Sequence, residues 1–424
     1  MKKVLIIGYP FPLKQGGSPR VLGLAKYLPE FGWSPTILTP PLDTEPDPAY
    51  RIIETGYRDI LAFWRKLFRF NAEDDIRKQV KGRFGVTGKK TILDRLMTFT
   101  GEIINYPDSE KGWKRFAVDA GDEFLRGEKM DAIISSSAPV IGHVIARELA
   151  TRYDIPWVAD LRDPWTQNHN YSYSRIRRAI DRRLEVKTLA DAAALVIVSR
   201  PWADNLNTLH RHTKAYVITN GFDPETVNTP PAALTEKFTI TYTGLIYPDR
   251  QDVGRLFEAV RMLIAEKALD AGRIEIRFYG PVETWMEKEV ERRGLSGAVT
   301  QYGPASRDIA IRKQRESQVL LLLNWDDPRE KGTYPGKIFE YLAARRPILS
   351  TGGSEDDVVT GLLRETQAGV NTITIESTVE AIREMYAEYA ASGGVTCHGD
   401  ERAIAAYNQR EMAKKYAEVL NSLG

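Results

Sequence analysis

The sequence predicts an α/β protein that contains two doubly wound parallel-sheet domains in tandem. Short apolar runs, rich in leucine and β-branched residues, alternate with helical patterns over most of the 424 residues, as successive βαβ units do. The alternation stops near residue 222 and restarts at residue 238. At about 150 residues per domain, the chain is long enough for two or three domains. We therefore expect a first domain over residues 1–222 and a second over residues 223–395.

The first domain opens with an unbroken apolar run over residues 4–7, which is typical of a strand buried on both faces. Gly16 and Gly17 lie in the loop before a helix over residues 19–28. A strand over residues 33–38 completes a right-handed crossover, which implies parallel pairing. Further strands are expected over residues 132–134, 156–159, 195–198 and 216–219, and helices over residues 140–150 and 175–190.

Residues 50–115 interrupt this alternation and are expected to form an insertion in the first domain. Residues 61–70 have the sequence LAFWRKLFRF, and residues 61–90 hold nine Lys or Arg against three Asp or Glu. One hypothesis is an interfacial helix that contacts anionic lipid or a lipid-linked substrate. The other is an insertion that packs its aromatic residues on the domain and leaves its charges in water.

The second domain repeats the alternation after a proline-rich stretch over residues 224–231, which we interpret as a linker. Strands are expected over residues 238–243, 274–279, 319–323 and 347–349, and helices over residues 253–265 and 336–344. Residues 396–424 should form a C-terminal helix, over about residues 402–423, that is long enough to pack back on the first domain. Ligands of such sheets bind beyond the carboxyl ends of the strands, so we expect a central cleft between the two domains.

Composition excludes several classes of protein. The chain has 59 basic and 57 acidic residues, a net charge of +2, so no general electrostatic field attracts nucleic acid. One cysteine, Cys397, excludes an intramolecular disulfide and metal sites built from clustered cysteines. No apolar run approaches the roughly 18 residues of a membrane span, and the run over residues 4–7 is too short for a signal peptide. We expect a cytoplasmic protein.

Several enzyme motifs are missing from the sequence. It contains no P-loop, no G-x-G-x-x-G after the first strand, no H-E-x-x-H and no G-x-S-x-G. Of the five histidines, only His210 and His212 have a spacing that could suit a metal, and we expect no metal site. Residues 135–137, Ser-Ser-Ser, end a strand, but without a histidine in register they are not nucleophile candidates.

The most informative stretch covers residues 330–344, where a loop leads into a helix. Gly332 and Gly336 let the backbone approach a ligand, and Pro335 is pre-organised for a helix start. A helix N-terminus offers free N–H groups and about half a positive charge to a phosphate. Lys337 would add a cation, and Glu340, three residues on, could accept two ribose hydroxyls. The alternative is an ordinary surface helix on which these two residues pair.

Residues 334–344, followed by Arg346-Pro347-Ile348-Leu349 and Gly352-Gly353, resemble the donor-binding segment of GT-B-fold glycosyltransferases, most closely glycosyltransferase family 4 of the bacterial polysaccharide type. Other landmarks resemble the family in order and spacing. They are Gly16-Gly17, the segment 159–165 (ADLRDPW), Ala190-Asp191 through Ser199, Asn220-Gly221-Phe222-Asp223, Thr243-Gly244 and Tyr302-Gly303. The resemblance covers nearly the whole chain outside residues 45–105.

The resemblance implies a GT-B fold and a retaining transfer of a sugar from a UDP- or GDP-linked donor, without an obligatory metal or covalent nucleophile. It implies a saccharide or lipid-linked acceptor in cell-surface glycan biosynthesis. The basic aromatic insertion adds the expectation of peripheral contact with an anionic membrane, at its inner face. The donor-binding residues that it implies are Gly16, Gly17, Gly244, Gly280, Thr333, Tyr334, Pro335, Gly336, Lys337 and Glu340.

The chain departs from the family at several of these positions. The first glutamate of the family's donor-binding pair would fall at Gly332, and either Glu330 or Thr333 could replace it. The family's phosphate-binding arginine and lysine correspond to Leu245 and Arg250.

Four residues are candidates for catalysis, and two more for the acceptor side. Arg250 and Lys337 would stabilise the leaving phosphate, and Arg162 stands where some members have a histidine that touches the donor sugar. Asp163 would orient the acceptor, or would serve as a helix cap or as a partner of Arg162. Asp160 has the same ambiguity and, with Trp165, is assigned to the acceptor side.

Two rival functions stay open from the sequence. A GT-B-fold nucleotide-sugar 2-epimerase would need carboxylates and histidine at the site, for which only Asp160 and Asp163 are available. A non-catalytic nucleotide-sugar-binding subunit is compatible with the unusual residues Gly332 and Leu245.

Overall fold

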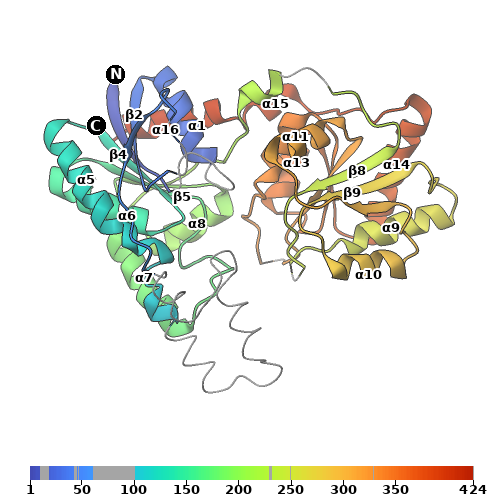
Figure 1. Ribbon diagram of the computed structural model, residues 1–424, viewed down its shortest axis with the longest axis horizontal. Coiled ribbons are helices and arrows are strands. Elements are labelled where there is room, and N and C mark those ends of the chain that lie inside the picture. Colours follow the sequence, from blue (N-terminus) through green and yellow to red (C-terminus); the bar gives the residue numbers. More distant parts are fainter. Residues whose placement is uncertain are drawn as a thin grey trace. The chain divides into compact units, whose positions relative to one another are not determined.

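The computed structural model describes residues 1–9, 19–42, 45, 47–60, 101–228, 232–248, 250–327 and 329–423. The chain forms two compact units, of which the first comprises Met1–Ile218 with Ala413–Gly424 and the second Thr219–Met412 (Figure 1). Gly16, Gly17 and residues 61–90 of the expected insertion lie outside the described residues.

The first unit is built on a seven-stranded sheet in the order β3-β2-β1-β4-β5-β6-β7, with every neighbouring pair parallel. Its strands are β1 (Lys2–Ile7), β2 (Trp33–Thr39), β3 (Arg51–Glu54), β4 (Ala132–Ser137), β5 (Trp157–Leu161), β6 (Ala194–Ile197) and β7 (Ala215–Val217). Its helices are α1 (Pro19–Tyr27), α5 (Lys114–Gly127), α6 (Ile141–Tyr153), α7 (Arg175–Leu189) and α8 (Arg200–Leu209), with short 3-10 turns over Leu28–Phe31 and Ser109–Trp113. Val4, Leu5, Ile6 and Ile7 are all buried, as the sequence predicted for a strand covered on both faces.

Strand β3 corrects the expected limits of the insertion. Arg51–Glu54 lies within residues 50–115, yet it pairs in parallel with β2 as an edge strand of the sheet. The sequence did not reveal this strand because its four residues begin and end with exposed charged side chains, and edge strands tolerate such ends.

The end of the chain returns to the first unit. It forms two helices, α15 (Glu401–Ala405) and α16 (Gln409–Asn421), rather than the single helix that we expected. The break has a local cause, because the side chain of Asn408 accepts a 2.8 Å hydrogen bond from the Glu411 N–H and so starts a new helix. Helix α15 belongs to the second unit, whereas residues from Ala413 onward belong to the first (Figure 1).

The second unit contains a six-stranded sheet in the order β10-β9-β8-β11-β12-β13, again with parallel neighbours. Its strands are β8 (Phe238–Thr243), β9 (Ile274–Tyr279), β10 (Val299–Gln301), β11 (Val319–Leu323), β12 (Ile348–Thr351) and β13 (Gly369–Thr372). Its helices, besides α15, are α9 (Gly254–Ala265), α10 (Thr284–Arg292), α11 (Arg307–Glu316), α12 (Lys337–Ala344), α13 (Val358–Thr366) and α14 (Ile375–Ser392). A 3-10 turn over Pro224–Asn228 occupies most of the stretch that we interpreted as a linker.

Strand β8 divides its side chains between two environments. Phe238, Ile240 and Tyr242 belong to the main apolar core of the unit. The alternate threonines point to the side of α11, where Thr241 Oγ1 accepts a 2.6 Å hydrogen bond from Ser317 Oγ, and Thr243 Oγ1 accepts one of 2.9 Å from Gln314 Nε2. This polar layer fixes α11 over the carboxyl half of β8. Within the described ranges, no helix combines the length and apolar character needed to cross a membrane.

Candidate functional site

Two neighbouring strands of the second unit end in glycines that lie against each other. Gly244 follows β8 with φ of +114°, a conformation that L side chains rarely adopt. At the end of β9, a Cβ added to Gly280 would lie 2.2 Å from the carbonyl oxygen of Gly244. Glycine is therefore required at both positions, and the two expected donor-binding glycines meet at one edge of the sheet.

Lys337, the first residue of α12, reaches the same edge. Its ammonium donates to the hydroxyl of Tyr242 and lies 3.8 Å from the centroid of that ring. A Cβ on Gly244 would be 3.2 Å from Nζ. Burial lowers the pKa of Lys337 to about 7, and nearby Glu340 opposes this shift. The lysine is thus held at the carboxyl end of β8 with its charge poorly stabilised by the protein itself.

Glu340 has different partners from Lys337. Its carboxylate forms a 3.1 Å ion pair with Arg307 Nη2 and accepts a 3.4 Å hydrogen bond from Gln314 Nε2. Both partners come from α11. Among the described residues, Lys337 and Glu340 do not form an ion pair with each other, so the ordinary surface pair is absent.

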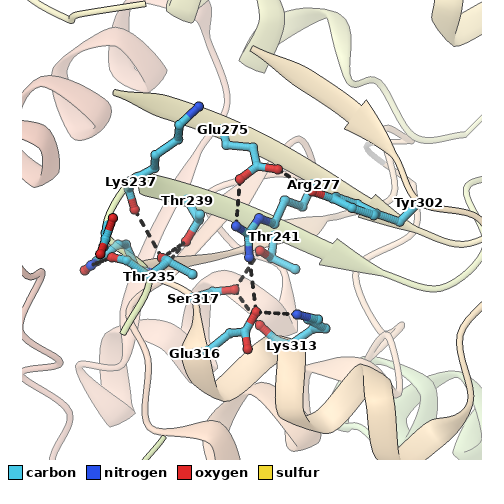
Figure 2. Close-up of polar contacts among 12 residues, drawn as sticks. Thr235, Lys237, Thr239, Thr241, Glu275, Arg277, Tyr302, Lys313, Glu316 and Ser317 are labelled. Carbon is cyan, nitrogen blue, oxygen red and sulfur yellow. Dashed lines mark hydrogen bonds and ion pairs between the residues drawn. The ribbon is translucent and has the colours of Figure 1, made fainter. Parts of the chain in front are cut away.

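Helix α11 is held in place by a network of charges, shown in Figure 2. Arg277 on β9 pairs with Glu275 at 2.6 Å and with Glu316, at the end of α11, at 3.2 Å. Lys313 donates to Glu316 at 2.7 Å, and the hydroxyl of Tyr302 donates to Glu275 at 2.5 Å. These contacts position α11 and, through it, the partners of Glu340.

The loop before α12 distinguishes the two residues that could replace the family's missing glutamate. Glu330 is buried, and its carboxylate accepts a 2.9 Å hydrogen bond from the Gly332 N–H, so it stabilises the loop itself. The hydroxyl of Thr333 is buried without a hydrogen-bond partner in the described part of the chain. Tyr334 packs against Phe339 with the ring centroids 5.8 Å apart. The loop therefore leaves the Thr333 hydroxyl with unused hydrogen-bonding capacity.

The loop residues Pro335 and Gly336 start α12 in the expected way. The Pro335 carbonyl accepts a 3.0 Å hydrogen bond from the Ile338 N–H. Gly336 is the N-cap residue and forms no side-chain cap hydrogen bond. The N-terminal N–H groups of α12 are therefore not capped by the side chain of the N-cap residue.

Arg250 lies in the loop that follows β8. Its N–H donates to the Tyr247 carbonyl at 2.9 Å, and its own carbonyl accepts from the Asp326 N–H at 2.8 Å. The guanidinium carbon is 6.0 Å from the ring centroid of Trp325, which stacks on Tyr247 at 5.5 Å. The loop after β8 thus supplies a half-buried cation, Arg250, in addition to Lys337 on α12.

In the first unit, Arg162 and Asp163 directly follow β5. Arg162 donates to the carbonyls of Ser137 and Ala138, at 2.5 and 2.7 Å, and burial lowers its pKa. Asp163 is exposed. The two residues lie where β4 and β5 end, the edge of a parallel sheet at which ligands bind.

Asp160 and Trp165 have surroundings that do not suit contact with an acceptor. Asp160 is fully buried, and its two carboxylate oxygens accept from Arg20 Nε at 3.0 Å each. Ser136 Oγ adds a 2.8 Å hydrogen bond. Trp165 is part of the apolar core, with its ring 6.4 Å from that of His143. Both side chains serve the interior of the first unit.

Residues 15–221 match the family model of the glycosyl transferase 4-like domain. Sucrose-phosphate synthase from Thermosynechococcus elongatus has a similar structure, with 13% identity, a TM-score of 0.61, and 100% of this chain and 99% of that chain covered. The structure of HepE of Anabaena in complex with UDP and glucose is also similar, with 12% sequence identity, a TM-score of 0.60 and full coverage of both chains. A third similar structure is a point mutant of S. aureus TarM in complex with fondaparinux, alpha-GlcNAc-glycerol and UDP. It has 9% sequence identity and a TM-score of 0.58, with 99% of this chain and 100% of that chain covered. No curated protein sequence matches the chain.

Residues 15–221 therefore match a glycosyl transferase 4-like domain, and the chain as a whole has the GT-B fold of the structures that it resembles. The fold class predicted from the sequence is confirmed, since both units have parallel α/β sheets and the structural matches extend over the whole chain.

One of the three serines over residues 135–137 does have a histidine in register. Ser135 Oγ lies 2.7 Å from Nδ1 of His143 and also accepts a 2.7 Å hydrogen bond from Trp157 Nε1. Both residues of the pair are fully buried, and burial lowers the pKa of His143 to about 4. The expectation that no histidine accompanies these serines was wrong, but burial makes the pair part of the core.

The candidate site also contains residues that the sequence did not reveal. Tyr242 holds Lys337, Arg307 and Gln314 hold Glu340, and the Tyr341 hydroxyl accepts a 3.2 Å hydrogen bond from the Thr243 N–H. Of these residues, only Tyr242 had a signal in the sequence, because the alternation of side chains along the expected strand directs it to the interior. Within the described ranges, no group of three or more His, Cys, Asp or Glu side chains is arranged to hold a metal ion.

Proposed function

We propose that this chain is a glycosyltransferase that transfers a sugar, with retention of anomeric configuration, from a UDP- or GDP-linked donor to a saccharide or lipid-linked acceptor of a cell-surface glycan. The observation that supports this most directly is the position of Lys337. It lies beside Gly244, at the N-terminus of α12 and at the carboxyl end of β8. HepE has been captured with UDP-glucose and TarM with UDP, which supports a nucleotide-diphosphate donor for this chain as well.

The charges at this site suit a diphosphate. The donor carries about two negative charges, whereas a helix N-terminus contributes about half a positive charge. Lys337 and Arg250 would supply the remainder without a metal. A diphosphate would also stabilise the charged form of Lys337, whose pKa burial lowers to about 7 in the free protein.

Glu340 and Thr333 suit the sugar hydroxyls of a nucleoside. A carboxylate has about four lone-pair sites, and the contacts of Glu340 with Arg307 and Gln314 occupy one site each. Its side chain keeps 32% of its surface exposed. We propose that Glu340 accepts ribose hydroxyls and that the unused Thr333 hydroxyl takes over from the missing glutamate.

The chemical step needs charge stabilisation more than a strong base. Breaking the bond between sugar and diphosphate leaves negative charge on the departing phosphate, and each donor aimed at that charge contributes about 2.7–4 kcal/mol in the transition state. Lys337 and Arg250 would have this role. In a retaining transfer, the departing phosphate oxygen can take the acceptor's proton. Arg162 and Asp163 are the corresponding proposals for the donor sugar and the acceptor.

We place the reaction in the cytoplasm, at the inner face of the membrane, and propose that the basic aromatic segment over residues 61–90 contacts anionic lipid. The support comes from its sequence alone, which holds nine basic and three acidic residues. That segment lies outside the described residues.

A panel of UDP- and GDP-sugars, with and without a chelator, tests the proposal. The expected result is slow release of UDP or GDP from one donor, faster release with an acceptor, and an axial or equatorial linkage in the product that matches the donor. An epimerised donor would instead identify a 2-epimerase. Binding without turnover would identify a non-catalytic subunit, and loss of activity with chelator would contradict the metal-free mechanism.

A further inference from the structure

Helix α7 of the first unit has an outward face with a high density of positive charge. Arg175, Arg178, Arg182, Arg183 and Lys187 are all exposed. Arg178 contacts Tyr171, with its guanidinium carbon 4.8 Å from the ring centroid. The other four cations make no hydrogen bond or ion pair with another described residue. The face therefore carries five positive charges on fifteen residues of helix.

The two acidic residues of α7 do not offset these charges at the surface. Asp181 is buried and pairs with Arg177 at 2.8 Å. Glu185 is also buried and accepts a 3.1 Å hydrogen bond from the Thr166 N–H. Both carboxylates serve the inner side of the helix, so its outer side is positive along its whole length.

Exposed isoleucines lie within this positive face. Ile176 is 68% exposed and Ile180 is 45% exposed. At 100° per residue, Ile176, Ile180, Arg183 and Lys187 fall on one stripe of the helix. Large aliphatic side chains at such exposure are unfavourable in water. An apolar stripe framed by cations is the pattern of a helix that lies in a membrane interface.

A third exposed isoleucine lies in a segment that is hydrogen-bonded to the start of α7. Glu102 accepts hydrogen bonds from the N–H and Oγ of Ser174, the N-cap residue of α7, at 2.7 and 2.6 Å. The buried Arg177 donates to the Pro107 carbonyl at 2.8 Å. These contacts fasten residues 102–107 to the start of α7, where Ile103 is 58% exposed. The backbone under the face is therefore rigidly supported by buried polar contacts.

We propose that the outward face of α7 docks on the surface of an anionic lipid bilayer, with its cations among the headgroups and Ile176 and Ile180 at the acyl boundary. Charge complementarity selects an anionic partner, and the isoleucines favour a bilayer over a soluble polyanion, because only the bilayer can bury them. This inference extends the membrane-side part of the proposed function to a described helix, and it does not depend on the identity of the donor.

Vesicle flotation of the full chain tests the inference, with vesicles of phosphatidylcholine alone and of phosphatidylcholine with phosphatidylglycerol. The wild type should float with the anionic vesicles at low salt and not with the neutral ones. At about fivefold in affinity for each cation near the surface, Arg182→Gln/Arg183→Gln/Lys187→Gln should weaken binding by roughly 100-fold. Ile176→Ser/Ile180→Ser should weaken it by at least about tenfold while leaving the charge unchanged.

A matched control removes three equally exposed arginines from other helices of the same unit. Arg115, Arg126 and Arg200 have side chains that are 89%, 73% and 80% exposed and pair with carboxylates of their own helices. Their replacement by Gln should change vesicle affinity by no more than about twofold. The control removes the same number of positive charges, but it removes them outside the α7 face, where salt screens their effect on the membrane contact.

Three results would overturn the inference. They are the absence of wild-type flotation with anionic vesicles, equal flotation of the α7 variants and the wild type, or equal weakening by the control variant. Binding to a soluble acidic polysaccharide without flotation would also overturn it. Hydrolysis of the nucleotide sugar in solution should be the same in all variants, so a failure of the docking inference is separable from a failure of the proposed transferase activity.

Discussion

Arg20 on α1 donates a 2.8 Å hydrogen bond to the hydroxyl of Tyr416 on α16, although the two residues are 396 positions apart in the chain. The same guanidinium pairs with Asp160 on β5 at 3.0 Å and donates to the Ile218 carbonyl at 2.8 Å. All three side chains are buried. One arginine on α1 thus contacts three separate parts of the first unit. They are strand β5 in the sheet, the backbone at Ile218 and the C-terminal helix α16.

Removing Arg20 should strongly destabilise the first unit. Arg20→Met leaves the Asp160 carboxylate buried without its counter-ion, which costs about 3–5 kcal/mol. Tyr416→Phe removes the two hydrogen bonds that this hydroxyl accepts from the Arg20 guanidinium, at 2.8 and 3.2 Å, and should cost about 1.5–3 kcal/mol. Urea unfolding measures both changes. A double variant, Arg20→Met/Asp160→Asn, should be more stable than the sum of the single changes predicts. A loss below about 1 kcal/mol in Arg20→Met would contradict the structural role.

Lys337 should affect turnover and stability in opposite directions. Lys337→Met removes a cation from the proposed phosphate site, and turnover should fall roughly 10²–10³-fold. The same change removes a buried charge that the protein stabilises poorly, so thermal stability should rise, by about 1 kcal/mol. Steady-state kinetics and thermal unfolding measure the two effects. Lys331→Met is the matched control, because this lysine pairs with Asp356 at the surface. Turnover within about threefold of the wild type in Lys337→Met would remove Lys337 from the phosphate site.

Donor affinity should decrease as pH rises above about 7. The pKa of Lys337 is lowered to about 7 in the free protein, and a bound diphosphate would raise it. Between the two values, binding takes up a proton, so affinity falls by up to about tenfold per pH unit. Calorimetry near pH 8 in two buffers with different ionisation enthalpies detects this proton. The Lys337→Met variant should show no such uptake, and uptake that persists in it would assign the proton to another group.

Glu340 should matter for the nucleotide more than for the fold. Glu340→Ala removes the proposed charged hydrogen bonds to the ribose, which costs about 1.5–3 kcal/mol, or roughly 10- to 150-fold in Kd. Calorimetry with UDP and with GDP measures the loss. Glu376→Ala, on the exposed first turn of α14, is the control and should bind as the wild type does. Unchanged affinity in Glu340→Ala would exclude the ribose contact.

His143 should make the first unit sensitive to acid. Burial lowers its pKa from 6.5 to about 4, while nearby Asp160 opposes the shift. The unfolded chain therefore binds this proton first, and the contribution of His143 to stability is present above about pH 6.5 and is lost as pH falls toward 4. At pH 5 the loss is about 2 kcal/mol. Denaturant unfolding at pH 7 and pH 5 measures it, and His143→Phe should reduce the difference between the two pH values by this amount. An equal difference in the variant would show that other groups cause the acid sensitivity.

The central strands were predictable from the sequence because their signal is local. The ranges expected for β8, β9 and β11 match the observed bounds, since each is an apolar or β-branched run between turns. Strands β3 and β13 were missed because they have four residues each, with partly exposed side chains at the sheet edges. Their strand conformation depends on pairing with a neighbour, which no short window of sequence contains.

In the candidate site, too, the residues with a local sequence signal were predictable and their distant partners were not. Lys337 and Glu340 were predictable because a loop with glycine and proline, a helix start and a buried strand lie together in one short segment. Their partners were not, because Tyr242 is 95 positions from Lys337 and Gln314 is 26 positions from Glu340. Asp160 was assigned to the acceptor side because its neighbours in sequence resemble a motif. Only the fold shows that Arg20, 140 positions away, occupies its carboxylate.

The return of residues from Ala413 onward to the first unit has a consequence for biosynthesis. A ribosome makes the whole second unit, Thr219–Met412, before it makes the helix that completes the first. During that interval the nascent first unit lacks Tyr416 and the apolar side chains of α16 that cover it, and its uncovered surface is a natural target for chaperones. Fusion tags or truncations that disturb this last helix should therefore lower the yield of folded protein by destabilising the amino-terminal half of the chain.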